Sequence, residues 1–432
     1  MHLTSTIAGK IGDGVKKTES VFSLACIYRV PEELRKLKES AYTPRLISIG
    51  PLHREDKHLQ TPLQHVKMSY ANHLFSRLTA GMEDHESALH TMTTVLQNCL
   101  AGMRASIDVA KKFYAEEVTL DEEMMLIDGC FILEFLYRFP TFDGQKRDPI
   151  FGNTLTLSNV KNDLVLLENQ IPFFVLEKLF QLTVGEIRNR PDENWSLTNY
   201  LRRCYDFKMS HENKESISYC HILHNLQDWY RPVAETLTGK PLISEGILMP
   251  SASELKYAGV KFVPDEKNKN LFKFSEPKGL FRMCGRPRFK IPTLTLYNET
   301  ELYLRNLIAF EQSCPGIPAY VTSYVFVMDT LVNSDSDIKV LEKAKVMSNY
   351  LGAREDATRV FNKICKEAAL GGDFFFAGTC SQATKYSKRF WPRYIAASKI
   401  YGNPWMFRAF FVGFVSFVIS VVQFARSFFR KY

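Results

Sequence analysis

Several features that would assign a function are missing from this chain of 432 residues. The N-terminus lacks the continuous apolar stretch of a signal peptide, so we expect the bulk of the chain to stay in the cytosol. No internal repeat, low-complexity tract or long Pro, Gly or Ser linker divides it, although its length suggests two or three domains. With 45% hydrophobic and 24% charged residues, the composition is that of a globular protein and excludes disorder for most of the chain.

The nine cysteines are odd in number, scattered and mostly set among apolar neighbours. This usage is typical of reduced, buried thiols rather than of a disulfide framework. Two glycosylation triplets, Asn194-Trp195-Ser196 and Asn298-Glu299-Thr300, favour an exported chain, but such triplets arise by chance at this length. The missing signal peptide outweighs them in this interpretation.

One cluster has the residue types of a metal site. Cys220, His221 and His224 share one helical turn, and Cys204 lies upstream, but no second pair has the short spacing of a zinc site. The segment is better explained as an amphipathic helix. Its inward side chains would be Ile222, Leu223, Leu226 and Trp229. We therefore expect no metal and no other cofactor.

Catalytic signatures are also absent. Any cysteine could pair with one of ten histidines, but no local motif selects a pair. Glu122 with Glu123 is best explained as a helix start, and Asp163 with Glu168 flanks an apolar run. The segment Gly9–Gly14 lacks the preceding strand and the Gly-Lys-Ser/Thr ending of a phosphate loop. The sequence predicts no catalytic residue, while an enzyme site assembled from distant segments stays an alternative.

A dense charged run, His53–His58, lies between Pro51 and Pro62. Most such runs are solvated loops. If a local segment carries a polar recognition surface, this exposed loop is our candidate.

Acidic residues are absent from the last part of the chain. Residues 374–432 contain nine Lys or Arg and no Asp or Glu, so this stretch carries +9 and the rest sums to −1 of the formal +8. A nucleic-acid binder would show its basic excess on the folded domain, so we expect no nucleic-acid partner. Basic residues beside an apolar segment are attracted to anionic lipid instead.

The uncharged run Ala409–Ala425 follows this basic approach. As a helix it spans about 25 Å, a little less than the roughly 30 Å core of a bilayer. A buried C-terminal helix is the alternative, but the run has no polar face for a soluble fold to expose. The sequence predicts a single-pass C-terminal anchor in a membrane, of which the plasma membrane is one candidate. Six Lys or Arg precede the run and three follow it, which favours a cytoplasmic body.

Apolar spacing predicts a mainly α fold of the α+β class, with a small late β-sheet. Alternating β-formers between Gly and Pro breaks predict short strands within 248–296. Helices are expected over 62–79, 89–114, 121–138, 299–311, 321–332, 336–351 and 355–369, with Ser336 and Asp337 as candidate caps of the helix over 336–351.

Residues 163–180 combine two apolar segments with a polar joint, Glu168-Asn169-Gln170, and a helix that can begin at Pro172. We expect the polar side chains to bond to the backbone groups freed at that joint.

Eight collinear pieces resemble the plant family of domain of unknown function 247. They are Ile27–Pro31, 41–56, 124–136, 163–180 with LLENQIPFF, 251–262, 291–312, 321–341 and Asn403-Pro404-Trp405. One departure is Leu52, where the family pattern implies an aromatic residue. The resemblance runs from about residue 25 to the C-terminus.

The resemblance implies plant membrane-associated proteins with a large helical domain, a C-terminal anchor and no established catalytic activity. Relatives associated with self-recognition between pollen and stigma imply protein partners. We expect a leader at 1–24, the family domain at 25–400, and a juxtamembrane segment with the anchor at 401–432. The favoured function is a non-enzymatic interaction module at a bilayer. A membrane-surface hydrolase and an outward-facing recognition protein are the alternatives.

Overall fold

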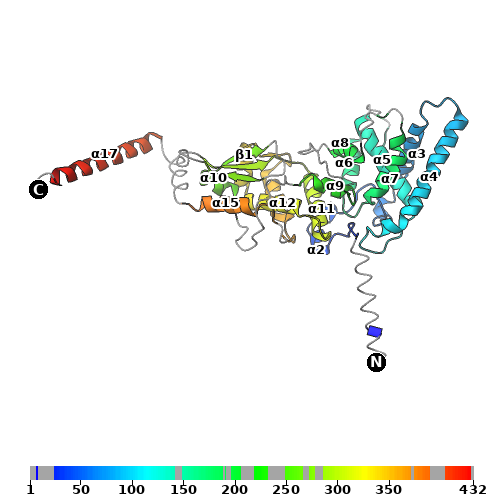
Figure 1. Ribbon diagram of the computed structural model, residues 1–432, viewed down its shortest axis with the longest axis horizontal. Helices are drawn as coiled ribbons and strands as arrows, with labels where there is room; N and C mark the ends of the chain where they lie inside the picture. The colour runs from blue at the N-terminus through cyan, green and yellow to red at the C-terminus, as the bar shows by residue number, and fades with distance from the viewer. Residues whose placement is uncertain are drawn as a thin grey trace.

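The computed structural model describes residues 6–7, 24–141, 148–187, 190, 196–205, 218–231, 249–265, 272–277, 286–370, 374–389 and 404–429. The expected leader at 1–24 therefore lies almost entirely outside the described residues. Figure 1 shows an elongated body whose N-terminal half is helical and whose C-terminal half combines helices with small sheets.

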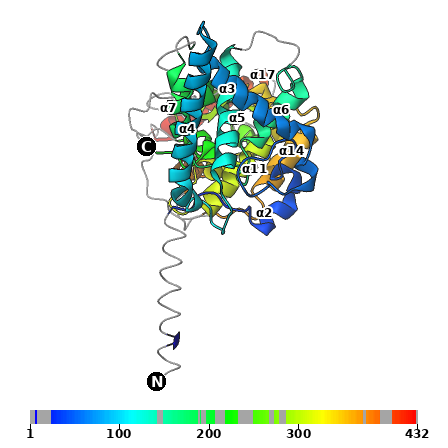
Figure 2. The same ribbon diagram turned by 90° about the vertical axis from the view of Figure 1, so that its right-hand side faces the viewer.

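The N-terminal half is a helical layer built around one central helix, α5, and Figure 2 looks onto its outer face. Its helices are α2 (Glu32–Leu37), α3 (His65–Leu78), α4 (His85–Lys111), α5 (Glu122–Thr141), α6 (Thr154–Asp163), α7 (Phe173–Leu182) and α8 (Leu197–Tyr205). Short 3-10 turns link them at η1 (Glu39–Ala41), η2 (Lys57–Leu59), η3 (Pro62–Gln64) and η4 (Val184–Glu186).

The long stripe predicted over 89–114 is helix α4, which the Asp84 side chain caps by accepting the amides of Glu86 and Ser87. The part of the stripe that is buried begins at Cys99 and continues at Met103, while Leu89 is exposed. Helix α4 therefore packs on α5 and α7 along its C-terminal half.

The segment between α6 and α7 begins with a buried loop. Residues 164–171, which combine apolar side chains with the Glu168-Asn169-Gln170 joint, form this loop. The new helix does begin after Pro172, which is the N-cap of α7. A loop can be buried here because polar side chains satisfy its backbone, as described below.

The C-terminal half carries the remaining elements. The helices are α9 (Ile222–Asp228), α10 (Ala252–Tyr257), α11 (Thr300–Ser313), α12 (Tyr320–Leu331), α13 (Asp335–Lys343), α14 (Arg354–Ile364), α15 (Ala377–Ser387) and α17 (Pro404–Phe429). The strands are β1 (Lys261–Asp265), β2 (Lys273–Ser275), β3 (Arg288–Pro292), β4 (Leu294–Leu296) and β5 (Met347–Asn349).

The strands form two small sheets. In the three-stranded sheet β3 is central, parallel to β1 and antiparallel to β2, with Phe289 aligned to Phe262 and Phe274. These three rings are buried, so the alternation that predicted strands reflects one apolar face. A parallel pair of β4 and β5 forms the second sheet.

Three predicted boundaries in this half are wrong. The helix expected over 355–369 is α14, which ends at Ile364. Residues 252–257 are the helix α10, because Ser251 and Glu254 form a reciprocal capping box at its start. The helix expected over 336–351 ends at Lys343, and Lys345 adopts a positive φ of 58° before β5. Its N-cap is Ser334, with Asp337 as the third helical residue of a second capping box, rather than Ser336.

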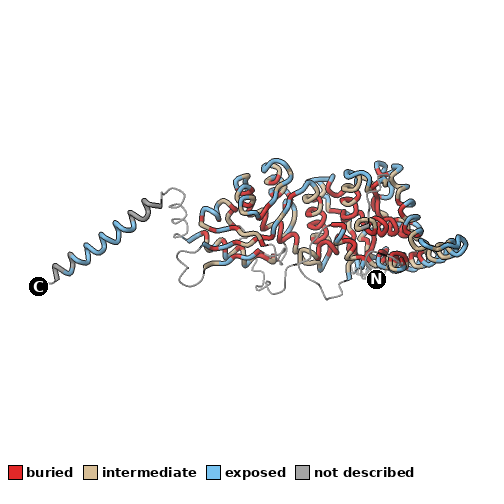
Figure 3. The backbone as a smooth tube through the Cα atoms, turned by 90° about the horizontal axis from the view of Figure 1, so that it is seen from above, coloured by how far each residue is buried: buried red, intermediate tan, exposed pale blue. Residues whose placement is uncertain are grey.

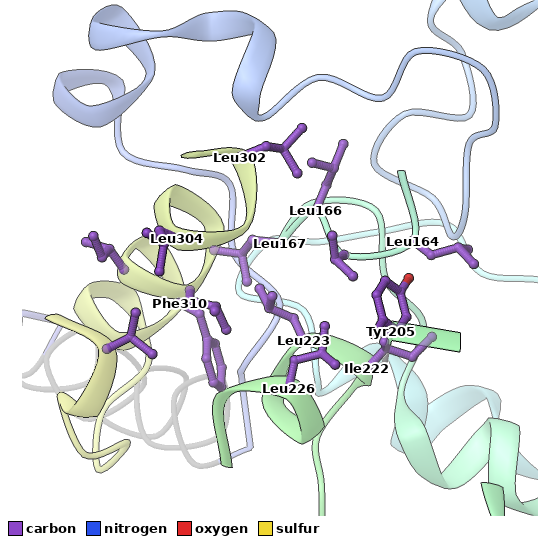
Figure 4. Packing of buried hydrophobic residues seen from close by; sticks show 14 of the residues in the cluster. Leu164, Leu166, Leu167, Tyr205, Ile222, Leu223, Leu226, Leu302, Leu304 and Phe310 are labelled. Atoms are coloured by element: carbon purple, nitrogen blue, oxygen red, sulfur yellow. The ribbon is translucent and has the colours of Figure 1, made fainter. Parts of the chain in front are cut away.

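The two halves share one apolar core, which Figure 3 shows as a continuous buried layer. Figure 4 shows the junction, where Leu166 of the loop lies beside Leu302 of α11 and Leu167 lies between α11 and Leu223 of α9. The amide of Leu167 also donates to Asn306 Oδ1 of α11 at 2.9 Å. The loop between α6 and α7 therefore connects the two halves.

The predicted mainly helical fold with small late sheets is confirmed. The transmembrane part of that prediction is not: within the described residues, no helix has the length and apolarity that a membrane crossing needs.

Candidate functional site

The chain segment before α3, residues 45–49, passes through the core as irregular backbone. Asp163, at the end of α6, accepts the amides of three successive residues of this segment. Its carboxylate accepts the amides of Arg45 and Leu46 at 2.8 Å and of Ile47 at 2.9 Å. Burial raises the pKa of Asp163 to about 6 although these amides oppose the shift.

Asn169 continues this pairing. Its Oδ1 accepts the Ile49 amide at 2.6 Å, and its Nδ2 donates to the carbonyls of Ile47 and Asp163. An amide side chain that both donates and accepts reproduces what a neighbouring strand would offer. The neighbouring Gln170 donates to the carbonyls of Leu164 and Leu166.

Gly50 lies where this segment turns, with φ of +70°. Its amide donates to Asp128 Oδ2 at 2.9 Å, and the other oxygen of Asp128 accepts Lys67 Nζ at 2.7 Å. A Cβ at position 50 would lie 2.5 Å from the Gln170 carbonyl oxygen. Only glycine fits this close approach without strain.

Glu168, the remaining polar residue of the joint, has a side chain with 0% exposure. Its Oε1 accepts the Val30 amide at 2.6 Å and is paired with Arg35. Its Oε2 lies 3.1 Å from His53 Nε2 and 3.5 Å from Arg29 Nη1. Burial raises the pKa of Glu168, but the His53, Val30 and Arg35 contacts outweigh burial, and the net pKa is lowered.

The prediction that His53–His58 forms an exposed recognition loop is wrong for its first residue. His53 is 4% exposed, and its Nδ1 lies 2.7 Å from Asp56 Oδ2 while its Nε2 faces Glu168. The sequence has no signal that predicts the burial of His53, since a charged run normally indicates a solvent-exposed loop. In the rest of the run, Arg54, Glu55, Lys57 and His58 are exposed, and Asp56 is partly buried.

These contacts give the acidic residues structural roles. Polar side chains of the Glu168-Asn169-Gln170 joint bond to backbone groups as expected, both within the loop and in the N-terminal segment. Because Glu168 is inaccessible and fully engaged, its arrangement with His53 and Asp56 stabilises the fold rather than presenting a base to a substrate.

Glu122 and Glu123 lie in the first turn of α5, as predicted, and Glu122 pairs with Arg104 at 2.9 Å.

The Cys220 cluster, defined as Cys26, Cys220, Cys314, His221 and His224, brings together residues from three distant segments. His221 is the N-cap of α9, where its Nδ1 accepts the His224 amide at 3.2 Å and its Nε2 lies 3.1 Å from the Cys26 carbonyl oxygen. The structural interpretation of His221 is confirmed. Burial lowers the pKa of His221 to about 3, so the ring is neutral.

The Cys220 amide donates to His224 Nδ1 at 3.1 Å. Cys204 is buried elsewhere, in α8. In the described part of the chain, no group of three or more His, Cys, Asp or Glu side chains has an arrangement that could hold a metal ion. All eight described cysteines are free and seven are buried, which confirms the prediction of reduced, mostly buried thiols.

Of the remaining candidates from the sequence, the structure describes only Asn298. Gly9–Gly14 and Asn194 lie outside the described residues. Asn298 is exposed in the turn between β4 and α11. A pair of exposed tyrosines, Tyr297 and Tyr350, stacks beside it with ring centroids 5.0 Å apart.

Helix α17 carries the most apolar exposed surface in the structure. Its residues from Phe411 to Gln423 are all exposed, and the apolar side chains among them keep 41–65% of their surface accessible (Figure 3). The basic residues that precede the apolar run in the sequence are partly paired. Arg389 forms an ion pair with Glu276 at 2.6 Å, while Lys385 and Lys388 are exposed.

Comparisons with known proteins match one family over most of the chain. Residues 27–419 match the model of the family DUF247, described as plant protein of unknown function. The chain is similar to the UPF0481 protein At3g47200 of Arabidopsis thaliana, with 27% identity over 410 residues that cover 88% of this chain and 82% of the relative. It is also similar to the putative UPF0481 protein At3g02645 of the same plant, with 22% identity over 92% of this chain and 89% of the relative. No solved structure matches the chain.

Proposed function

Because the chain belongs to the DUF247 family of plant proteins, whose description assigns no activity, we propose its function from its own residues. It is a non-enzymatic protein that α17 attaches to a lipid bilayer, and its folded body binds other proteins at that surface.

The exposed apolar surface of α17 is the observation that carries this proposal. A helix that exposes Phe, Val and Ile all around has no solvated face, and such a helix is stable when a partner or lipid covers it. Lipid is favoured because the uncharged run Ala409–Ala425 is nearly as long as a bilayer core.

The distribution of charge supports a lipid partner. In the sequence, Arg408 directly precedes the uncharged run and Arg426 directly follows it. Cations at both ends of an apolar helix fit the headgroup regions, where each basic residue contributes about 1 kcal/mol on an anionic surface.

The body supports a binding role rather than a catalytic one. The buried carboxylates of Asp163, Glu168 and Glu134 are engaged with amides, arginines and His53, so these three groups do not present a base to a substrate. His224 contacts the rings of Tyr219, His221 and Phe310 rather than an orienting carboxylate. The hydrolase alternative therefore has no observation in its favour.

Fractionation of plant cells that express matched variants tests the proposal. The variant Val415→Asp with Val418→Asp places two charges in the apolar run, each costing about 2.5–3.5 kcal/mol in a bilayer. We expect the unaltered chain in the membrane fraction after high-salt washing and the variant in the supernatant.

The control carries the same kind of change on the body, Leu155→Asp with Tyr350→Asp, at side chains that are 70% and 65% exposed. It should stay in the membrane fraction. Release of the unaltered chain by salt alone, or equal release of both variants, would refute attachment through α17.

A second candidate keeps the anchor but places the body outside the cell. The exposed position of Asn298, in a turn and within a glycosylation triplet, favours it. A shift in mobility after removal of N-glycans, lost in Asn298→Gln, would establish the outward orientation, whereas an unshifted band in both would support a cytoplasmic body.

A further inference from the structure

The three-stranded sheet has one face on the apolar core and one face in solvent. Phe262, Phe274 and Phe289 are aligned across the strands and lie on the buried face. Phe274 contacts the Tyr386 ring of α15, with centroids 5.8 Å apart. Because side chains alternate along a strand, the residues on either side of these phenylalanines belong to the opposite face.

That opposite face is basic. Its cations, which we call the basic sheet face, are Lys261 of β1, Lys273 of β2, and Arg288 and Lys290 of β3. The first three are exposed and Lys290 is half-buried. Val263 and Ser275 complete the two cross-strand rows, so every charge in these rows is positive.

Nearby acidic residues do not neutralise the face. Asp265, at the far end of β1, is 7% exposed, and Glu276, next to β2, is paired with Arg389 at 2.6 Å. Within the part of the chain that the structure describes, none of the four cations forms an ion pair. The face therefore keeps its full positive charge.

The register places these cations opposite one another. Lys261 is aligned with Arg288, and Lys273 with Lys290. Neighbouring strands are about 4.8 Å apart and alternate residues of a strand about 7 Å apart, so the four charges share one small area. Like charges that face each other across strands destabilise a sheet. An anionic partner on this face would offset that repulsion.

The local sequence is basic as well. Residues 256–290 contain ten Lys or Arg and three Asp or Glu, so this segment carries +7. Residues 1–373 as a whole sum to −1, so the rest of the body is acidic, at −8. A net charge taken over the whole body conceals this local excess. The sheet is therefore the part of the body that an anionic surface attracts.

The sheet lies at the end of the body from which the chain continues to α17. Figure 1 shows β1, α10 and α15 together at the end of the body opposite α3 and α4. Helix α15 packs on β2, and residues 390–403 join it to α17. Because an extended residue spans at most about 3.6 Å, this connection holds the sheet within about 50 Å of α17.

A bilayer fits this face better than a nucleic acid does. Proteins that bind single strands stack the bases on exposed aromatic rings, and proteins that read duplexes place a helix or a two-stranded ribbon in a groove. The phenylalanines of these strands are all buried, and the cations lie on a three-stranded sheet. Lipid headgroups require only a positive surface beside them.

We propose that the basic sheet face docks on the anionic phospholipid headgroups of the membrane that α17 enters. The inference rests on the proposed function, because α17 brings the body to the bilayer. It adds the class of lipid that the body recognises, and it orients the body with the sheet towards the membrane and α3 and α4 away from it.

Flotation of the full-length chain with a disabled anchor tests this docking. Val415→Asp with Val418→Asp removes apolar insertion, so binding to vesicles then depends on charge. The vesicles are phosphatidylcholine alone, or phosphatidylcholine with about one part in three of phosphatidylserine, at about 0.1 M salt. We expect this chain to float with the mixed vesicles and to stay at the bottom with phosphatidylcholine alone.

Two matched variants of that chain separate the sheet from net charge. The sheet variant carries Lys261→Gln, Lys273→Gln, Arg288→Gln and Lys290→Gln. Each cation near an anionic surface strengthens binding about fivefold, so its affinity for the mixed vesicles should fall at least about twentyfold. The control neutralises four exposed cations of the N-terminal half, Lys57→Gln, Lys111→Gln, Lys112→Gln and Arg203→Gln. It should lose less than about threefold, because cations far from the surface are screened.

Acetylation of lysines on the unaltered chain decides the matter even where a variant fails to fold. Phosphatidylserine in the vesicles should slow the acetylation of Lys261 and Lys273 at least about fivefold and leave Lys111 and Lys112 unchanged.

Equal affinities of the two variants, or unprotected Lys261 and Lys273, would overturn the docking. Binding of a labelled oligonucleotide that the sheet variant alone loses, without any change in vesicle binding, would overturn it in favour of nucleic acid. Failure of the unaltered chain to insert into neutral vesicles bears on α17 alone, since the anchor-disabled chain reports on the sheet by itself.

Discussion

Replacing Glu168 with glutamine tests the buried charge network directly. Glutamine keeps the size of the side chain and an oxygen for the Val30 amide, but it removes the charge that faces Arg35 and His53. Arg35 has only 20% of its side chain exposed, and His53 has 5%. The substitution therefore removes the charged partner of Arg35 and leaves His53 with Asp56 alone.

The expected loss of unfolding free energy follows from the burial of the network. Removing one partner of a buried ion pair costs about 3–5 kcal/mol, and the retained Val30 bond places Glu168→Gln near the lower end, at about 3 kcal/mol. The matched control is Glu116→Gln, which breaks an ion pair with the same Arg29 at the surface. Glu116 is 45% exposed and Arg29 is 49% exposed, so we expect a loss of less than about 1 kcal/mol.

Equilibrium unfolding in urea, followed by circular dichroism in one detergent, measures both variants. The midpoint should fall clearly for Glu168→Gln and little for Glu116→Gln, with an unchanged denaturant slope. Equal losses in the two variants, within about 0.5 kcal/mol, would refute the reasoning that this network stabilises the fold.

Three further predictions concern single sites. Gly50→Ala should cost about 2–4 kcal/mol, because its positive φ strains alanine and the new Cβ meets the Gln170 carbonyl, whereas Gly81→Ala has a similar φ but open space and should cost about 1 kcal/mol in the same unfolding assay. Burial raises the pKa of Glu311 to about 7 from a usual value of 4.5, so the folded chain binds this proton more tightly. The resulting stability should be complete below about pH 4.5 and lost by about 3 kcal/mol as pH rises through 7, and Glu311→Gln should abolish that slope in a pH series of urea unfolding. Ser334→Ala should cost about 1 kcal/mol by removing the N-cap of α13, and hydrogen exchange should report faster opening of that helix.

Local signals in the sequence predicted most helices well. Residues such as Pro172 and Asp121 mark helix starts that the structure reproduces nearby, and the apolar stripe of α4 is present with its buried half. The missed helix α10 had a local signal, Ser251 followed by Glu254, which apolar alternation in the next residues outweighed.

Local sequence patterns could not predict the contacts between distant segments. The burial of His53 depends on Glu168, and the pairing of residues 45–49 depends on Asp163 and Asn169, all far along the chain. Cys26 and His221, whose backbone oxygen and ring nitrogen are in contact, carry no shared motif either. Such contacts form through packing between segments that lie far apart in the chain, which spacing within one segment does not encode.

Vesicle flotation of the purified full-length chain tests attachment through α17 most directly. Neutral vesicles at 1 M salt screen the basic residues and leave only apolar contact. We predict that the chain floats with these vesicles, and that the Val415→Asp, Val418→Asp variant stays at the bottom of the gradient. A chain that floats only with anionic vesicles at low salt, or not at all, would contradict insertion of the apolar helix.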